Sequence, residues 1–244
     1  MNVAMILAGG VGKRLGKNQP KQFVEVLGKP LIAYCLEIYE ASPHIDAIEV
    51  VCKAEFIDEV KSYKEKYGFS KLSWVVPGGS SCQESTKNGI YALEGKLQPE
   101  DMLIIGMSTS VFVNDEIIKD SLDVAAKRGN AFCGMQCIYN MATTDDGISS
   151  KSINFKEKHK TLNMPWTAPF GTYLRLYKEG EAKGIEMGET SYAPTLFLAL
   201  EETLYFSKDT SKNKLHVTTP EDLEIVTGCL LLERRVKLTE EDYE

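Results

Sequence analysis

The residues best suited to chemistry gather near the start of the chain. Gly9, Gly10 and Gly12 follow directly on an apolar run, and the cations Arg14 and Lys21 come shortly after them. Glycines let the backbone adopt positive φ values and lie close to a ligand, so that N–H groups can face phosphate oxygens. Cations beside such a turn would share the phosphate charge. The pattern therefore indicates a nucleotide triphosphate site after a first strand.

Other glycine-rich signatures fit this stretch less well. The dinucleotide fingerprint G-x-G-x-x-G is matched only loosely, by Gly10, Gly12 and a displaced Gly16, and the phosphate loop G-x-x-x-x-G-K-[ST] does not occur. A turn that only packs a helix against a strand is a further alternative. Arg14 and the run Pro-Lys-Gln-Phe at 20–23 favour the nucleotide site.

Apolar runs that are typical of buried strands alternate along the chain with runs of helical periodicity. Strands are expected over Val3–Leu7, Ala47–Val51, Leu72–Val76, Met102–Ile105 and Ala131–Ile138. Helices are expected over Leu31–Tyr39, Phe56–Lys66, Glu84–Leu93, Asp115–Lys127 and Leu223–Leu232, the last with Thr219 as N-cap and Pro220 after it. This alternation predicts an α/β fold with a doubly wound, mostly parallel sheet. Ligands of such sheets bind at the carboxyl ends of the strands, where we expect the motifs to converge.

Composition narrows the class of protein. A chain of 244 residues with 43% apolar content suits a single α/β domain. The net charge of −7 argues against nucleic acid or an anionic membrane as the main partner. The six cysteines form no C-x-x-C pair, which favours reduced thiols over a zinc site. No apolar run reaches the length of a membrane span and no basic leader opens the sequence, so we expect a cytoplasmic protein.

Three segments resemble the motifs of the sugar-phosphate nucleotidyltransferases. Residues 7–16 read L-A-G-G-V-G-K-R-L-G, and the P-K-Q-F that follows is similar to the cytidylyltransferase branch that makes CDP-methylerythritol or CDP-ribitol. Residues 78–89 resemble the family's G-G-x-x-R-x-x-S-V-x-N-G, and residues 217–223 resemble its K-[IV]-T-x-P-x-D-L. The matches follow the family order and span most of the chain.

This resemblance implies a Rossmann-like nucleotidyltransferase domain over residues 1–244. Its expected reaction is transfer of CMP from CTP to a polyol or sugar phosphate, with release of pyrophosphate and with Mg²⁺ as cofactor, for isoprenoid or cell-envelope polymer synthesis. The implied catalytic residues are Arg14, Lys21 and His216. The implied nucleotide-binding residues are Leu7, Ala8, Gly9, Gly10, Gly12, Gly79 and Ser85.

The acceptor and metal side departs from the family pattern. The family carries H-D-x-x-R-P-F-V where residues 106–113 here read G-M-S-T-S-V-F-V, so Met107 replaces an aspartate and Ser110 an arginine. Cys82 replaces the arginine of the second motif, and His216 replaces the lysine before the third. The family's T-P-Q-x-F survives as a remnant at residues 167–170, and its T-D has no clear counterpart near residues 190–193.

These departures leave several functions open. The chain is either an enzyme with a changed acceptor, an impaired paralogue that binds nucleotide, or an activity-free partner subunit. A dinucleotide-binding oxidoreductase is a further alternative. Replacement groups for the lost charges could be His159, His216, Asp145, Asp146 and Asp222. Asp222 is more simply explained as a structural residue in the first turn of its helix.

Residues 140–163 interrupt the alternation of strands and helices. The stretch is polar and weakly periodic, which is typical of a functional excursion or of a surface loop. The resemblance implies an arm that embraces a second subunit, and therefore a homodimer.

Overall fold

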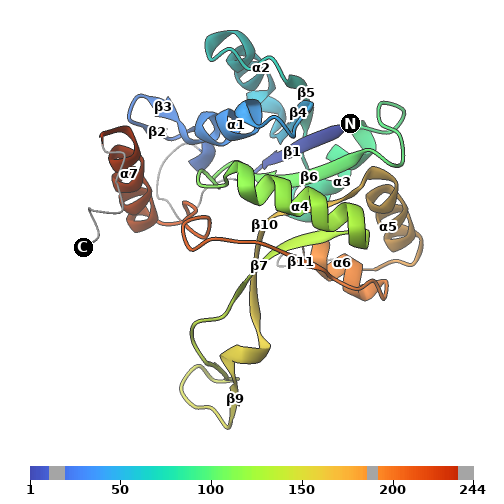
Figure 1. Cartoon of the computed structure of the whole chain (residues 1–244), viewed down its shortest axis with the longest axis vertical. Coiled ribbons are helices and arrows are strands. Elements are labelled where there is room, and N and C mark those ends of the chain that lie inside the picture. The colour runs from blue at the N-terminus through green and yellow to red at the C-terminus, as the bar shows by residue number, and fades with distance from the viewer. Residues whose placement is uncertain (11–19, 186–191, 236–244) are drawn as a thin grey trace.

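A seven-stranded sheet forms the centre of the computed structural model, which describes residues 1–10, 20–185 and 192–235. Among these residues the strand order is β5, β4, β1, β6, β10, β7, β11 (Figure 1). The strands are β1 (Asn2–Ala8), β4 (Ala47–Cys52), β5 (Leu72–Pro77), β6 (Met102–Met107), β7 (Ala131–Gln136), β10 (Lys160–Pro169) and β11 (Phe206–Ser207). Only β10 runs antiparallel to its neighbours, so the expected doubly wound, mostly parallel sheet is confirmed.

Helices cover both faces of the sheet, as Figure 1 shows. One face packs against α1 (Leu31–Ala41), α2 (Ile57–Lys66) and α4 (Asp115–Arg128). The other packs against α3 (Cys82–Ala92), α5 (Phe170–Ala182) and α6 (Ala193–Ala199). Because successive side chains of a strand point to opposite faces, β1 contributes Ala4 and Ile6 to the first core and Val3 and Met5 to the second. A strand buried on both faces reads as one continuous apolar run, which is why the sequence predicted it.

A third, smaller core joins the C-terminal helix to the body. There Val226 and Leu230 of α7 (Pro220–Arg235) join a cluster with Val26 of β2 (Glu25–Val26), the strand that pairs with β3 (Lys29–Pro30). Thr219 caps α7 as expected, because its hydroxyl accepts from the backbone N–H of Asp222 at 3.2 Å. Within the described residues, no helix combines the length and apolar character needed to cross a membrane.

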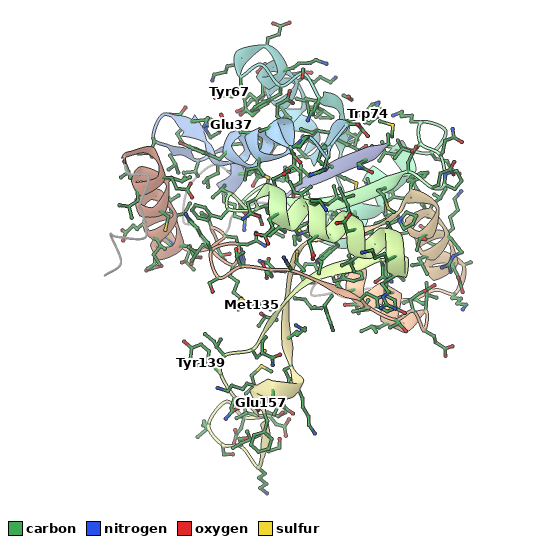
Figure 2. All side chains as sticks on the ribbon, viewed as in Figure 1. Glu37, Tyr67, Trp74, Met135, Tyr139 and Glu157 are labelled. Atoms are coloured by element: carbon green, nitrogen blue, oxygen red, sulfur yellow. The ribbon has the colours of Figure 1, made fainter. Side chains whose placement is uncertain are left out.

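An arm projects from the body at the junction of β7 and β10 (Figure 1). It holds an antiparallel hairpin of β8 (Met141–Thr143) and β9 (Ser152–Asn154), followed by a short 3₁₀ turn, η4 (Lys156–Lys158). The backbone N–H of Cys137 donates to the carbonyl of His159 at 3.0 Å where the arm begins. Figure 2 shows Tyr139 and Glu157 well outside the body, whereas Met135 lies near its boundary.

Strand direction sends several chain segments to one edge of the sheet. The strands β1, β5 and β6 are parallel and end at Ala8, Pro77 and Met107, so the turns that follow them share this carboxyl edge. The arm leaves from the same edge, since β10 is antiparallel to β6 and begins where β6 ends. The convergence of motifs that the sequence predicts is therefore a direct result of sheet topology.

One carboxyl group lies in the middle of the sheet without a partner. Glu49 of β4 pairs with Met5 of β1 on one side and Trp74 of β5 on the other, and its exposed fraction is 0%. Both carboxylate oxygens lack a hydrogen bond. Burial raises the pKa of Glu49 to about 8, although the nearby Lys96 ammonium opposes that rise. Glu49 is therefore protonated in the folded protein at neutral pH, which avoids the cost of a buried charge.

Glu49→Gln should make folding less sensitive to pH. The folded pKa of Glu49 is raised above the usual 4.5, so the folded chain holds a proton that the unfolded chain releases as pH rises from about 4.5 to 8. The wild type should consequently lose stability over this range, by up to about 1.4 kcal/mol per pH unit relative to the variant. Urea unfolding of both proteins at pH 5, 6.5 and 8 measures this difference. A stability difference that stays constant with pH would contradict the assignment.

Candidate functional site

A cavity of about 230 Å³ opens at the carboxyl edge of the sheet. Its walls come from the end of β1, the short 3₁₀ turn η2 (Lys21–Phe23), the turn that leads into α3, and the end of β6. The lining residues are Leu7, Gly9, Gly10, Lys21, Gln22, Gly79, Ser80, Ser81, Cys82, Ser85, Met107 and Ser108. Three regions that the sequence analysis compared with the family motifs, around residues 7–22, 78–89 and 106–113, thus meet at one cavity.

The glycine turn and the start of α3 pack closely against each other. The Ser85 hydroxyl accepts from the backbone N–H of Gly79 at 3.0 Å. A Cβ added to Gly9 would lie 3.1 Å from that same Ser85 oxygen, and one added to Gly78 would lie 2.8 Å from it. A side chain at either glycine would therefore displace the Ser85 hydroxyl. The glycines are needed because two backbone segments approach one hydroxyl group.

Two side chains, those of Ser81 and Glu84, hold the first turn of α3. The Ser81 hydroxyl accepts from the N–H of Glu84 at 3.0 Å, and the Glu84 carboxylate accepts from the N–H and hydroxyl of Ser80 at 2.7 and 2.6 Å. The helix therefore starts at Cys82, two residues before the expected Glu84. The spacing of Ser81 and Glu84 is the capping-box signal that would have placed this start correctly. The positive end of the helix dipole faces the cavity edge, where it favours an anion.

Lys21 supplies the charge of the described cavity. Its aliphatic chain lies beside Gly10, since a Cβ built on Gly10 would sit 4.0 Å from Lys21 Cε. Its Nζ donates to the carbonyl of Val217 at 2.8 Å. Among the described lining residues no other side chain carries a charge, and none is a carboxylate. The cavity is therefore suited to an anionic ligand rather than to a cation.

Gln22 was not among the predicted site residues, yet it is central to the cavity wall. Its exposed fraction is 1%, and its Nε2 donates to the carbonyls of Ala8 and Gly10 at 2.5 and 3.0 Å. The signal available in the sequence was a polar residue between Lys21 and Phe23 in the P-K-Q-F run. A glutamine beside a core phenylalanine must find partners for its amide, and the glycine turn provides them.

The other predicted site residues fall into three groups. Ala8 is buried behind the cavity, where its carbonyl accepts from Gln22. His216 is exposed and lines a separate small cavity with Lys214 and Asp222, although its neighbour Val217 contacts Lys21. Arg14 and Gly12 lie outside the described residues. The roles given to these residues stay predictions.

Two of the positions that depart from the family pattern are at this cavity. Cys82 and Met107 line it, and burial raises the pKa of the Cys82 thiol to about 11, so the thiol is neutral at pH 7. Ser110 is buried behind the edge. Thr167 of the T-A-P-F remnant is fully buried and shares a 2.7 Å hydrogen bond with Ser121 of α4, which makes it a core residue.

The donor set of the cavity does not fit a protein-held Mg²⁺. Mg²⁺ prefers oxygen ligands, usually including carboxylates, whereas the side chains of the described lining offer hydroxyls, one carboxamide, a thiol, a thioether and an ammonium group, and no carboxylate. In the described ranges no three His, Cys, Asp or Glu side chains gather into a metal-binding group.

The remaining candidates for replacement charges lie away from the cavity lining. Asp146 and His159 belong to the arm, where the Asp146 carboxylate accepts from the N–H groups of Ile148 and Ser149 and closes a local turn. Asp222 accepts from the N–H groups of Thr218 and Thr219 at 2.9 and 2.8 Å. Burial acts to raise the pKa of Asp222, but these bonds hold it below its usual value. Its expected structural role is confirmed.

A second cavity, of about 210 Å³, lies between α3 and α5 and shares Ser81 with the first. Its lysine, Lys87, is paired with Glu181 at 2.7 Å. No predicted site residue lines this second cavity. The cavity of the glycine turn is therefore the candidate functional site.

Comparison with known families agrees with this geometry. Residues 2–230 match the family described as IspD: 2-C-methyl-D-erythritol 4-phosphate cytidylyltransferase. The chain belongs to this family. The IspD match covers every strand of the sheet and all the residues that line the cavity.

Relatives within the IspD family carry two different names. A ribitol-5-phosphate cytidylyltransferase of Lacticaseibacillus paracasei is 32% identical over 94% of this chain and 98% of its own length. A 2-C-methyl-D-erythritol 4-phosphate cytidylyltransferase of Clostridium acetobutylicum is 31% identical over 91% of this chain and 94% of its own length. A solved 4-diphosphocytidyl-2C-methyl-D-erythritol synthase from Anaerococcus prevotii superposes with a TM-score of 0.77 at 19% identity, over 95% of this chain and 98% of that one, and so shares the fold.

Gly79→Ala should damage the site through its effect on α3. A Cβ at this position would lie 2.3 to 2.6 Å from the Cγ, Cδ and Cβ atoms of Glu84, so the capping carboxylate must move. We expect a loss of about 1–3 kcal/mol of stability and weaker binding of a nucleoside triphosphate. Thermal unfolding and calorimetric titration measure the two effects. Gly228→Ala, where an added Cβ meets nothing within 4 Å, is the matched control and should bind normally.

Proposed function

We propose that this protein transfers CMP from CTP to the phosphate group of a polyol or sugar phosphate and releases pyrophosphate. The observation that carries the proposal is the meeting of Gly9, Gly10 and Lys21 with Gly79 and Ser85 around one cavity. Membership of the IspD family supports cytidine as the nucleoside, and the names of the relatives support a polyol phosphate as the acceptor.

The proposed reaction requires alignment and charge neutralisation more than covalent chemistry from the protein. An oxygen of the acceptor phosphate attacks the α-phosphorus of CTP and forms a new P–O bond. The bond from the α-phosphorus to the bridging oxygen of the β-phosphate breaks, and pyrophosphate leaves with that electron pair. The backbone of Gly9 and Gly10 would cradle the phosphates, and Lys21 would neutralise charge that builds on the α-phosphoryl oxygens. Gly79 and Ser85 would contact the nucleoside.

In the proposed reaction, Mg²⁺ would be held by the nucleotide rather than by the protein. A divalent ion would reach the cavity already bound to the triphosphate, because the described lining offers no carboxylate to hold it. It would offset phosphate charge there.

The alternative to an active enzyme is a protein that binds CTP but does not catalyse the transfer. Met107 and Cys82 place neutral side chains in the cavity where the family pattern has a carboxylate and a cation. An enzyme with a changed acceptor would release pyrophosphate with some polyol phosphate, whereas an impaired paralogue would bind CTP and release none. A pyrophosphate assay with ribitol 5-phosphate and methylerythritol 4-phosphate separates them.

Lys21→Ala should weaken CTP binding and turnover together. The variant removes the charged group beside Gly10, and one such electrostatic contact contributes roughly 3 kcal/mol in a transition state. Calorimetry with CTP, using ATP as comparison, and the pyrophosphate assay measure the loss. Lys71→Ala is the matched control, because Lys71 also donates to a carbonyl, that of Ser42 at 2.6 Å, but at the opposite edge of the sheet. Unchanged CTP affinity in Lys21→Ala would contradict the assignment.

We also propose that the arm binds a second copy of the chain. Apolar side chains that would normally be buried are exposed along it, with exposed fractions of 91% for Ile148, 75% for Tyr139 and 60% for both Ile153 and Phe155 (Tyr139 is labelled in Figure 2). Such a concentration of exposed apolar surface marks an interaction site. The resemblance to a dimeric family favours a homodimer as the occupant.

Ile153→Asp combined with Phe155→Ser should convert a dimer to a monomer. The two changes remove exposed apolar surface and add a charge on the arm, which projects from the body. Sedimentation equilibrium of both proteins measures the assembly state. Ser152→Asp, at an exposed polar position of the same strand, serves as a control for added charge and should leave the dimer intact. A wild type that sediments as a monomer at all concentrations would exclude this role of the arm.

A further inference from the structure

The amide nitrogen of Gln22 donates to two carbonyls of the glycine turn at once. The carbonyls of Ala8 and Gly10 both point to Gln22 Nε2, at 2.5 and 3.0 Å. A primary amide nitrogen has two hydrogens, and both are used here. The amide orientation is therefore fixed, because its oxygen could not face two carbonyl oxygens.

The position of Gln22 is itself fixed by the core. Phe23, the next residue, stacks on Phe56 with ring centroids 4.4 Å apart and belongs to the core under α1 and α2. The backbone of η2 is closed by hydrogen bonds from Phe23 N–H to the Pro20 carbonyl and from Val24 N–H to the Lys21 carbonyl. Gln22 therefore connects the glycine turn to a segment whose position is fixed by core packing and by backbone hydrogen bonds.

The two hydrogen bonds from Gln22 to these carbonyls also set the direction of the backbone N–H groups that would face a ligand. In a trans peptide the carbonyl of Ala8 and the N–H of Gly9 point in opposite directions, so holding the first sets the second. Glycine has no side chain to restrict its backbone, so without the two hydrogen bonds from Gln22 the residues Gly9 and Gly10 would sample many conformations. Ordering the turn before the ligand arrives removes that entropic cost from binding.

We infer that Gln22 is a positioning residue for the nucleotide, which holds the glycine turn in its binding conformation through two hydrogen bonds from one amide nitrogen. The inference rests on the proposed function, because it takes the cavity to be the site of the triphosphate. Gln22 Oε1 is directed away from both carbonyls, and it accepts no hydrogen bond from the described part of the chain. Gln22 lines the cavity, so this oxygen would accept from a donor group of the ligand.

The test compares three variants for CTP binding, stability and backbone exchange. Gln22→Met keeps the volume and removes both hydrogen bonds, so the dissociation constant for CTP should rise about tenfold. Gln22→Glu should weaken binding further, because a carboxylate faces two carbonyl oxygens and the triphosphate. Amide hydrogen exchange at Gly9 and Gly10 should accelerate in both variants, which reports directly on order in the turn.

Asn130→Ala is the matched control for a purely structural effect. Asn130 is also a buried amide with two backbone partners, the Thr203 carbonyl at 2.9 Å and the Tyr205 N–H at 3.0 Å. It precedes β7 and so lies at the edge of the sheet opposite the cavity. This control should lose stability but keep wild-type CTP affinity and normal exchange at Gly9 and Gly10.

Two results would overturn the inference. One is a Gln22→Met variant that binds CTP as the wild type does, with unchanged exchange at Gly9 and Gly10. The other is a loss of affinity in Asn130→Ala equal to that in Gln22→Met, which would show that global stability alone sets binding. Failure of the wild type to bind CTP would instead refute the proposed function, while accelerated exchange in Gln22→Met would still show that Gln22 orders the turn.

Discussion

The burial of β1 on both faces is the constraint on which the rest of the structure depends. From Val3 to Ala8 every side chain is enclosed, between β4 and β6 in the sheet and between two helical layers across it. Such a strand can neither slip by one residue nor shift its end, since a slip would exchange its two sets of core side chains. The point where the chain leaves the sheet is therefore fixed, and the turn at Gly9 and Gly10 inherits that precision. The position of the cavity therefore depends on where β1 ends.

The two sides of the site differ in how firmly they are tied to the fold. On the proposed nucleotide side, Gly79, Ser85 and Gln22 make hydrogen bonds to backbone or approach a neighbouring element so closely that another residue would disturb it. On the other side, Cys82 and Met107 are half-buried side chains at the ends of elements. Residues of the second kind can change type with little effect on the sheet. This difference allows Cys82 and Met107 to depart from the family pattern while the glycine turn and its contacts keep it.

The sequence predicted the elements whose signals are local. Apolar runs located β1, β4 and β6, although Glu49 interrupts the run of β4, and three of the motifs met at the expected edge. The strand β10 was not predicted, because Lys160–Pro169 contains two prolines and begins with exposed residues, and its partners β6 and β7 lie far away in the chain. The helices α5 and α6 were missed as well. Gln22 was missed because its importance lies in carbonyls twelve and fourteen residues earlier, which no periodicity reveals. The roles of Arg14 and His216 stay predictions.

The way the arm joins the sheet allows the length of the arm to change without a change in the body. The chain leaves β7 after Gln136 and returns at Lys160, and these two residues are paired across the ladder. The core is thus closed before the arm begins, and residues added at its tip need no change in the body. Doubling such a loop costs only about 0.6 kcal/mol in closure entropy. Over evolutionary time the reach of the arm could therefore be altered by insertion or deletion while the strand register beside the cavity remained the same.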